Sequence, residues 1–334
     1  MIGANGFIGS HLCDAILTKT DWKIHALDTK TGYLEKYLSH PRFHLRQGCM
    51  TIEKKWLETH IKKSDVVIPL AAIANPLQYV QDPLRVFELD FEANLSIIRK
   101  CHALQKRLIF PSTSEVYGMC ADKFFDEEKS FCITGPIHKE RWIYANAKQL
   151  LDRIIYAYGK HEGLNYTIFR PFNWYGPRLD DINDQSARVI TKFIGNILRG
   201  EDILLSDGGT QKRSFTYIDD GIDALIKIIE NKNDNAHQKI FNIGNPYEII
   251  SIAELGELII FLMKELMEIK SVIRAEKSVD LYGQGYEDIL HRAPSISSIQ
   301  KFFDWTPKMN LKEGLQQVIR YCCENYCHAT SLSF

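Results

Sequence analysis

The glycine-rich turn near the start of the chain constrains its fold more than any other feature. Residues 3–9 read GANGFIG, and Gly3, Gly6 and Gly9 lead directly into an amphipathic helical pattern. Glycines lack a Cβ and therefore permit a tight turn and a close approach to a ligand's phosphates. The helix that follows supplies N–H groups and the positive end of its dipole to those phosphates. The turn predicts a dinucleotide-binding α/β fold, although three glycines alone are a weak signal.

An acidic residue at a suitable distance strengthens this interpretation. Asp28 ends the apolar run at 23–28, about 20 residues after the turn. A carboxylate there accepts both hydroxyls of an adenosine ribose and repels a 2′-phosphate, which favours NAD over NADP. The plainer alternative is a glycine turn beside a capping aspartate. Only Met1 and Ile2 precede Gly3, where a full strand is expected, so we expect a weaker sheet and weaker cofactor binding.

The first two thirds of the chain alternate short apolar runs with helical patterns. Strands are expected at 23–28, 65–70, 107–111 and 166–171, and helices at 8–18, 83–103 and 142–161. This alternation indicates parallel βαβ units, and right-handed crossovers then give a Rossmann-like doubly wound parallel sheet of the α/β class. We expect residues 1–171 to form the NAD-binding domain and residues 172–330 a smaller C-terminal substrate-binding lobe. Residues 214–246 are expected to return to the large domain.

Within the lobe, turn and capping signals mark the expected elements. Helices are expected at 187–198, 221–230, 252–267 and 311–325, and strands at 214–218 and 239–246. Asp219 and Asp220 are expected to cap the helix at 221–230, and Ser251 the helix that starts at Ile252.

Composition argues against several classes of function. The 334 residues carry a formal net charge of −1, so no global field attracts nucleic acid or an anionic membrane. No apolar run approaches the length of a membrane span and no signal pattern is visible, so we expect a cytoplasmic protein without membrane insertion. None of the eight cysteines has zinc-ribbon spacing. Cys323, Cys327 and His328 lie close together but lack further ligands, and we expect reduced thiols and no metal.

A tyrosine and a lysine four residues apart suggest the chemistry. In YANAK, Tyr144 and Lys148 share one helical face. A nearby ammonium lowers a tyrosine pKa, so that Tyr144 can take a proton from a sugar hydroxyl while hydride leaves for a nicotinamide. This spacing is common by chance. It gains weight because residues 112–115 read STSE and end an apolar run, at the sheet edge where ligands bind.

Four segments together resemble the extended short-chain dehydrogenase/reductase family of NAD-dependent epimerases and dehydratases: GANGFIGSHL, PSTSEVYG, YANAK and RPFNWYGPR. Within that family, PLRVFELDFEANL, FPSTSEVYGMC, RPFNWYGPRLD and GYEDILHRAPSI are similar to the UDP-glucuronate decarboxylases of polymyxin resistance. They are also similar to UDP-apiose/UDP-xylose synthases. The resemblance covers nearly the whole chain. It implies NAD as cofactor, a UDP-sugar as substrate, and a homodimer formed through the helices around 83–103 and 142–161.

The resemblance also implies roles for single residues. Tyr144 and Lys148 would serve oxidation at C4 of the sugar, and Glu115 and Arg292 decarboxylation with its proton transfer. Residues implied at the cofactor are Gly3, Asn5, Gly6, Phe7, Ile8, Gly9, Asp28, Cys49, Met50, Tyr144 and Lys148. Residues implied at the UDP-sugar are Ala74, Tyr79, Thr113, Ser114, Arg141, Asn173, Lys212, Arg213 and Tyr286.

Three departures from the family pattern accompany this resemblance. Cys49 stands where family members usually carry an aspartate that meets adenine. Leu204 stands where the decarboxylases carry a lysine beside the uridine site. The formyltransferase domain fused to those decarboxylases is absent from this sequence. If this protein serves the same pathway, formylation would come from another chain; the alternative is that it serves a different pathway.

The expected reaction follows from the chemistry of glucuronate. Oxidation of C4 to a ketone makes a β-keto acid, and carbon dioxide then leaves because the carbonyl takes up the electron pair. We therefore expect NAD-dependent oxidative decarboxylation of UDP-glucuronate to UDP-4-keto-pentose or UDP-xylose, as in lipopolysaccharide biosynthesis. The alternatives are another nucleotide-sugar 4-epimerase or dehydratase, a UDP-apiose/UDP-xylose synthase, and a non-catalytic NAD-binding protein.

Overall fold

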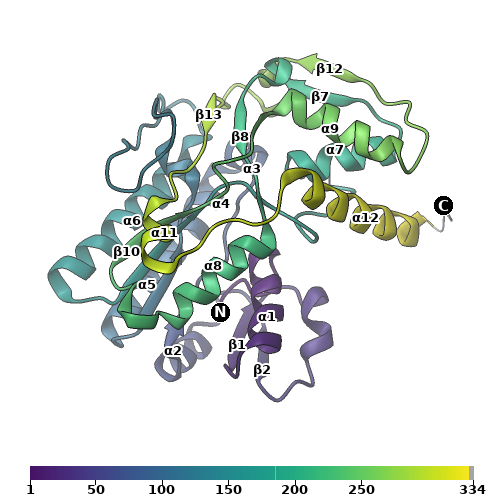
Figure 1. The fold of residues 1–334 in the computed structure, drawn as a ribbon. Helices are drawn as coiled ribbons and strands as arrows, with labels where there is room; N and C mark the ends of the chain where they lie inside the picture. Colours follow the sequence, from purple (N-terminus) through teal and green to yellow (C-terminus); the bar gives the residue numbers. More distant parts are fainter. Residues whose placement is uncertain (185, 331–334) are drawn as a thin grey trace.

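A parallel sheet with helices on both faces forms the larger part of the molecule in the computed structural model, which describes residues 1–184 and 186–330, the last five as backbone only (Figure 1). Its strands are β1 (Ile24–Asp28), β2 (Phe43–Gln47), β3 (Val66–Val67), β4 (Arg107–Pro111), β5 (Tyr166–Pro171) and β10 (Lys239–Ile243). β1 pairs with β2, and β3, β4, β5 and β10 follow one another, all in parallel. This is the doubly wound α/β fold expected from the sequence.

Met1 and Ile2 join the two halves of this sheet. The backbone N–H of Ile2 donates to Ile68 O at 3.0 Å, and the N–H of Leu70 donates to Ile2 O at 2.7 Å. On the other side, the N–H of Leu27 donates to Met1 O at 2.9 Å. Ile2 thus lies between β1 and β3, where the central strand of this fold is expected. The N–H of Gly3 also donates to Leu27 O at 2.8 Å, so residues 1–3 occupy the place of the expected first strand.

Two apolar cores cover the two faces of the sheet. On one face pack α1 (Phe7–Lys19) and α8 (Ile218–Glu230), and on the other α2 (Lys54–Lys63), α5 (Asn94–Ala103) and α6 (Trp142–Glu162). In α6, Leu151 and Ile155 stand four residues apart and are fully buried against strand residues such as Ile168. Each such side chain contributes about 1.5–3 kcal/mol through burial. These contacts fix the helix that carries Tyr144 relative to the strand ends.

The helix expected at 83–103 is interrupted. It consists of α4 (Pro83–Phe87), a π-helical turn η2 (Glu88–Ala93) and α5. The side-chain amide of Asn94 donates to Leu89 O at 3.0 Å and so satisfies a carbonyl within the irregular turn. The prediction of one continuous α-helix was wrong here. Such π turns often accompany functional residues, and this one carries the fully buried Asp90.

The lobe gathers beyond one end of the sheet (Figure 1). Its helices are α7 (Val189–Leu198), α9 (Ile252–Lys264), α10 (Ser278–Tyr282) and α12 (Leu311–Thr330), and its strands are β6 (Trp174–Tyr175), β7 (Ile203–Ser206), β8 (Lys212–Ser214), β9 (Thr216–Tyr217), β11 (Ile249–Ser251), β12 (Ile273–Glu276) and β13 (His291–Arg292). β8 lies between β11 and β13, β7 pairs with β12, and β6 with β9. The remaining elements are α3 (Pro76–Gln81), α11 (Ser297–Phe303) and the 3-10 turns η1 (Gly32–Tyr37), η3 (Ser114–Tyr117), η4 (Asp207–Gly209) and η5 (Lys232–Asp234).

Two predicted helix starts have different outcomes. The Ser251 hydroxyl accepts from the backbone N–H of Glu254 at 3.1 Å while the Glu254 carboxylate accepts from the N–H of Ser251, so the predicted cap is confirmed as a capping box. Capping by Asp219 and Asp220 was wrong, because α8 already begins at Ile218 without a side-chain cap. The Asp220 carboxylate instead accepts two backbone N–H groups, of residues 308 and 309, each at 3.0 Å.

The pairing of β10 with β5 brings residues 239–243 of the later sequence back into the large sheet. The domain boundary near residue 171 stays a prediction. Within the described chain, no helix is both long enough and apolar enough to cross a bilayer.

Candidate active site

A cavity of about 330 Å³ lies between the carboxyl ends of the strands and the lobe. Of the residues predicted from the sequence, it is lined by Phe7, Ile8, Ala74, Tyr79, Thr113, Ser114, Glu115, Arg141, Tyr144, Lys148, Asn173, Arg213, Tyr286 and Arg292. Its lining does not include Gly3, Asn5, Gly6, Gly9, Asp28, Cys49, Met50 or Lys212. Apart from Lys212, these belong to the glycine turn and to the ends of β1 and β2. The fold therefore unites residues from position 7 to position 292 in one site.

The glycine turn leaves no room for larger residues. Gly3 has φ +77°, and a Cβ on it would stand 2.6 Å from the backbone nitrogen of Ala71. A Cβ on Gly9 would stand 2.4 Å from the carbonyl oxygen of Gly3. The N-cap of α1, Gly6, makes no side-chain cap, and the first turn holds no acidic residue. Unused N–H groups and the helix dipole therefore fit the pyrophosphate of a dinucleotide.

Asp28 stands beside this turn at the end of β1. Its carboxylate accepts from the backbone N–H of Asn5 at 2.8 Å and from that of Lys30 at 2.9 Å. Because it is only partly buried, its remaining lone pairs are open to ribose hydroxyls. Cys49 and Met50 follow the neighbouring strand, where the Cys49 sulfur lies 3.1 Å from the Thr51 hydroxyl. These residues surround the place where the adenosine half of a dinucleotide fits.

Tyr144 is buried on the first turn of α6. Its ring stacks on that of Tyr79, with centroids 4.6 Å apart and planes at 9°. Burial raises the pKa of Tyr144, and the negative charges of Asp90 and Glu115 raise it further. The expectation that Lys148 brings this pKa toward neutrality was therefore wrong for the structure as it stands. Burial raises the pKa of Tyr144 more than one nearby ammonium lowers it, and residue spacing alone does not reveal burial.

Lys148 is held by partners other than Tyr144. Its ammonium donates to Pro111 O at 3.2 Å and lies 3.6 Å from Oδ1 of Asp90, while the Tyr144 ring centroid is 5.8 Å away. Asp90 is fully buried, and its other oxygen accepts from the N–H of Ile73 at 2.9 Å. Burial raises the pKa of Asp90 to about 6, although Lys148 opposes this. Sequence reasoning missed Asp90, whose only signal was an acidic residue within an otherwise helical pattern.

A buried network ties α6 to the strands behind it. The Asp152 carboxylate, one turn beyond Lys148, accepts from the Ser112 hydroxyl at 2.8 Å and from Nη2 of Arg170 at 2.9 Å. Nη1 of Arg170 also donates to the Tyr117 hydroxyl at 2.8 Å. Ser112 follows β4 and Arg170 lies on β5, so these bonds fix the catalytic face of α6 against the strand ends.

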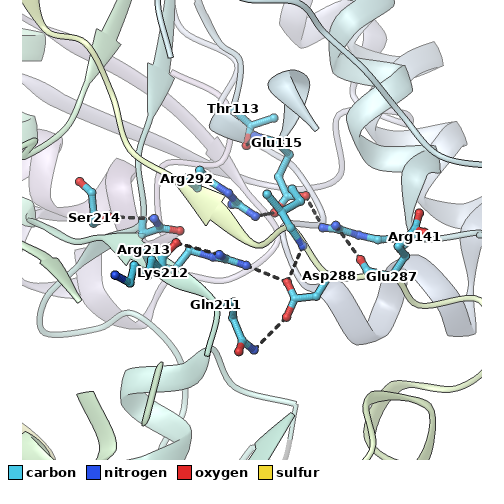
Figure 2. Close-up of polar contacts among 12 residues, drawn as sticks. Thr113, Glu115, Arg141, Gln211, Lys212, Arg213, Ser214, Glu287, Asp288 and Arg292 are labelled. Atoms are coloured by element: carbon cyan, nitrogen blue, oxygen red, sulfur yellow. Dashed lines mark hydrogen bonds and ion pairs between the residues drawn. The ribbon is translucent and has the colours of Figure 1, made fainter. Parts of the chain in front are cut away.

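Glu115 lies between two arginines (Figure 2). Its Oε1 forms an ion pair with Nη2 of Arg292 at 2.8 Å, and its Oε2 accepts from Nη2 of Arg141. Burial alone would raise the pKa of Glu115, but the two guanidinium groups more than offset this and hold it below its usual range. One carboxylate neutralises only one of two cations, so this trio keeps one surplus positive charge. The Nε atoms of Arg141 and Arg292 are buried without hydrogen-bond partners, which leaves donors for a ligand.

Arg213 stands beside this trio. The register of β13 on β8 pairs Arg292 with Arg213, so both side chains leave the same face. Nη2 of Arg213 donates to Oδ1 of Asp288 at 2.7 Å, and the Gln211 amide donates to the other oxygen of Asp288 at 2.9 Å (Figure 2). Burial and the charge of Arg292 lower the pKa of Arg213 to about 10. Asp288, a further residue missed from the sequence, thus stabilises a strongly desolvated cation.

Lys212 does not join the cavity. Adjacent residues of a strand point to opposite faces, and Figure 2 shows Lys212 and Arg213 leaving β8 in different directions. Lys212 is exposed. The structure instead brings Arg188, Lys192, Gln211, Tyr282 and Asp288 into the lining, none of which was predicted.

The other predicted substrate residues lie around these charges. Asn173, with φ +41°, donates its side-chain amide to Ser214 O at 2.8 Å. The ring of Tyr286 stacks on Tyr282 with centroids 4.3 Å apart. Thr113 accepts from the N–H of Glu115 at 3.2 Å and Ser114 is buried beside it. No cluster of three or more metal-ligating side chains occurs in the described part of the chain, and Cys327 and His328 lie outside the described side chains.

Comparisons with known proteins agree with this architecture. Residues 1–244 match the model of the NAD dependent epimerase/dehydratase family. The crystal structure of PbgP3 protein from Burkholderia pseudomallei is 47% identical, with 98% of this chain and 96% of that chain covered and a TM-score of 0.89. A UDP-N-acetylglucosamine 4-epimerase from Methanobrevibacter ruminantium, solved with UDP-N-acetylmuramic acid, is 26% identical over 97% of each chain, with a TM-score of 0.81. A UDP-glucuronic acid 4-epimerase from Bacillus cereus, solved with UDP-glucuronic acid and NAD, is 24% identical over 97% of this chain and 98% of that chain, with a TM-score of 0.82, and shares the fold.

Proposed function

Because this chain belongs to the NAD dependent epimerase/dehydratase family of nucleotide-sugar enzymes, we propose that it catalyses the oxidative decarboxylation of UDP-glucuronate. NAD is the cofactor of this family. The glycine turn and the uncapped start of α1 support binding of its pyrophosphate, and Asp28 supports binding of the adenosine ribose. When bound, NAD accepts a hydride from C4 of the sugar.

Tyr144 is the proposed base. The oxygen of its phenolate form takes the proton of the C4 hydroxyl as the hydride departs, so that the two transfers together leave a ketone. Burial lowers the pKa of Lys148, and the carboxylate of Asp90 opposes this by favouring the ammonium form. That ammonium is proposed to stabilise the phenolate form of Tyr144 from beyond the ring. The bond from Asp90 to Ile73 also anchors the loop that carries Ala74 into the cavity. Thr113 and Ser114 are proposed to hold the sugar between these groups.

The observation that carries the proposal is the Arg141–Glu115–Arg292 trio. Its surplus positive charge and two buried, unpartnered Nε atoms match a ligand carboxylate, and the fork of an arginine suits such a group. After C4 is oxidised, the bond between C5 and the carboxylate carbon breaks and its electron pair moves toward the C4 carbonyl. Carbon dioxide leaves, and a proton replaces it at C5. Arg292 is proposed to orient the carboxylate, and Glu115 or Arg292 to handle that proton.

A second candidate is a 4-epimerase acting on UDP-glucuronate. It would bind the same carboxylate through the same trio, as the common fold with the Bacillus cereus epimerase suggests. The two functions differ in the fate of the carboxylate carbon. The test is incubation with NAD and either UDP-glucuronate or UDP-glucose, with carbon dioxide and NADH measured together. We expect carbon dioxide from UDP-glucuronate only, whereas conversion to UDP-galacturonate without gas release would favour the epimerase.

The cofactor preference gives a separate prediction. Asp28→Asn keeps the shape of the side chain but removes the charge that repels a 2′-phosphate. We expect the wild-type protein to bind NAD more tightly than NADP. In the variant, the ratio of the Kd for NADP to the Kd for NAD should fall at least several-fold. Kd values for both cofactors, measured by titration calorimetry, check this. Tighter binding of NADP than NAD by the wild-type protein would refute the role of Asp28.

Other expectations from the sequence are kept as proposals. We propose a cytoplasmic homodimer formed through the helices of residues 83–103 and α6, where Leu84, Leu150 and Tyr156 are exposed. We also propose that residues 1–171 bind NAD and residues 172–330 the UDP-sugar. The proposed product is UDP-4-keto-pentose, or UDP-xylose where the reduced cofactor returns its hydride in place.

A further inference from the structure

Charge compensation inside the cavity singles out one lysine. Eight charged side chains line the cavity: Glu115, Arg141, Lys148, Arg188, Lys192, Arg213, Asp288 and Arg292. Seven of them take part in ion pairs, with Asp90 serving Lys148 and Asp180 serving Arg188. Lys192 is the exception, because no carboxylate among the described residues pairs with it.

The surroundings of Lys192 make this lack of a partner costly. The side chain leaves α7, which packs against β7, and is half-buried. Its ammonium lies 5.9 Å from the centroid of the Tyr282 ring, and Leu204 and Phe193 also line the cavity. Burial lowers the pKa of Lys192, with no charged group acting on it in either direction. A desolvated cation without a counter-charge is unfavourable unless a ligand supplies one.

We propose that Lys192 binds the diphosphate of the nucleotide sugar, an inference that rests on the proposed UDP-sugar substrate. The compact ammonium of lysine binds phosphate oxygens as a point charge. Tyr282 beside it, and Leu204 elsewhere in the lining of the same cavity, suit the uracil ring attached to that diphosphate. Lys192 would thus supply the positive charge that a lysine at position 204 supplies in the similar decarboxylases, where this chain has Leu204.

The charges of such a ligand require a cation beyond the Arg141–Glu115–Arg292 trio. The Arg141–Glu115–Arg292 trio has one surplus positive charge, which a single carboxylate neutralises. Arg213 is already compensated by Asp288. The two negative charges of a diphosphate therefore need a further cation, and Lys192 is the one that the cavity offers. Lys212, assigned to this site by resemblance, is exposed and absent from the lining.

Titration calorimetry with UDP and with uridine tests the proposal on the purified full chain. UDP has no carboxylate, so the result is independent of whether the protein decarboxylates UDP-glucuronate. The variants are Lys192→Met, Lys192→Arg and the control Lys264→Met, which removes the same charge from an exposed position on α9. We expect Lys192→Met to weaken UDP binding about tenfold to a hundredfold, the value of a charged hydrogen bond.

The other measurements separate phosphate binding from a structural role. Uridine and NAD should bind to Lys192→Met as to the wild type, Lys192→Arg should keep most of the UDP affinity, and Lys264→Met should match the wild type. Unchanged UDP binding by Lys192→Met would overturn the proposal. So would an equal loss for uridine, or a larger loss in Lys212→Met. Weaker discrimination of UDP-glucuronate from UDP-glucose with unchanged UDP binding would assign Lys192 to the carboxylate instead.

Discussion

Replacing Tyr144 by phenylalanine is expected to lower kcat about 10²–10⁴-fold while the affinities for NAD and the UDP-sugar change little. The ring of Tyr144 stacks on Tyr79, and phenylalanine preserves that contact. Only the phenolic oxygen, which takes the proton of the C4 hydroxyl, is lost. The loss should therefore fall on kcat rather than on binding. NADH formation followed by absorbance, with Kd values for both ligands, measures this.

Tyr247→Phe is the matched control. Tyr247 is 68% exposed and absent from the cavity lining. Its variant should keep wild-type rates. If Tyr144→Phe stays within a few-fold of the wild type, Tyr144 is not the base and another group must take the proton.

Arg292→Met is expected to lower carbon dioxide release from UDP-glucuronate about 10²–10³-fold, as for the loss of one preorganised charged donor. NAD affinity should be retained, because Arg292 lies on β13, apart from the glycine turn. Arg292→Lys should also be poor, since one ammonium cannot hold Glu115 at 2.8 Å and present a second donor to a carboxylate in the same plane. Oxidation and decarboxylation can be coupled, so NADH formation is expected to fall as well.

The melting temperatures of the Arg292 variants distinguish a loss of catalysis from a loss of stability. Arg292 is buried and paired with Glu115, so its loss can lower stability. Arg320→Met, at an exposed position on α12, is the control for removal of an arginine. If both Arg292 variants fold and release carbon dioxide at the wild-type rate, Arg292 is structural and the decarboxylase proposal loses its most specific residue.

The sequence predicted the sheet well because its signals are local. The strands at 107–111 and 166–171 begin and end as expected, since short apolar runs bounded by polar residues are typical of buried parallel strands. The helix expected at 83–103 is interrupted by the π turn η2, which no local sequence pattern indicated. Its π turn is stabilised by contacts of Asp90 with Ile73 and Lys148, far along the chain. Such contacts become known only when the fold is known.

The residues of the sequence motifs were expected at the site, whereas the charged residues that compensate them were not. Asp288 lies 75 residues from its partner Arg213, and neither Asp90 nor Lys192 belongs to a recognisable motif. The pKa of Tyr144 depends on burial, which spacing does not reveal. The position of Lys212 was missed because the strand was expected at 214–218, whereas β8 begins at Lys212. Lys212 and Arg213 are therefore adjacent in a strand, and the alternation of side chains allows only one of them to face the cavity.

The most direct test of decarboxylation is ¹³C NMR of the reaction with UDP-glucuronate labelled at the carboxylate carbon, in the presence of NAD. We expect the label to leave the sugar and to appear as carbon dioxide and bicarbonate, while an unlabelled UDP-pentose or its 4-keto form accumulates in equal amount. A label that stays in a UDP-hexuronate, with UDP-galacturonate formed, would contradict decarboxylation and identify a 4-epimerase.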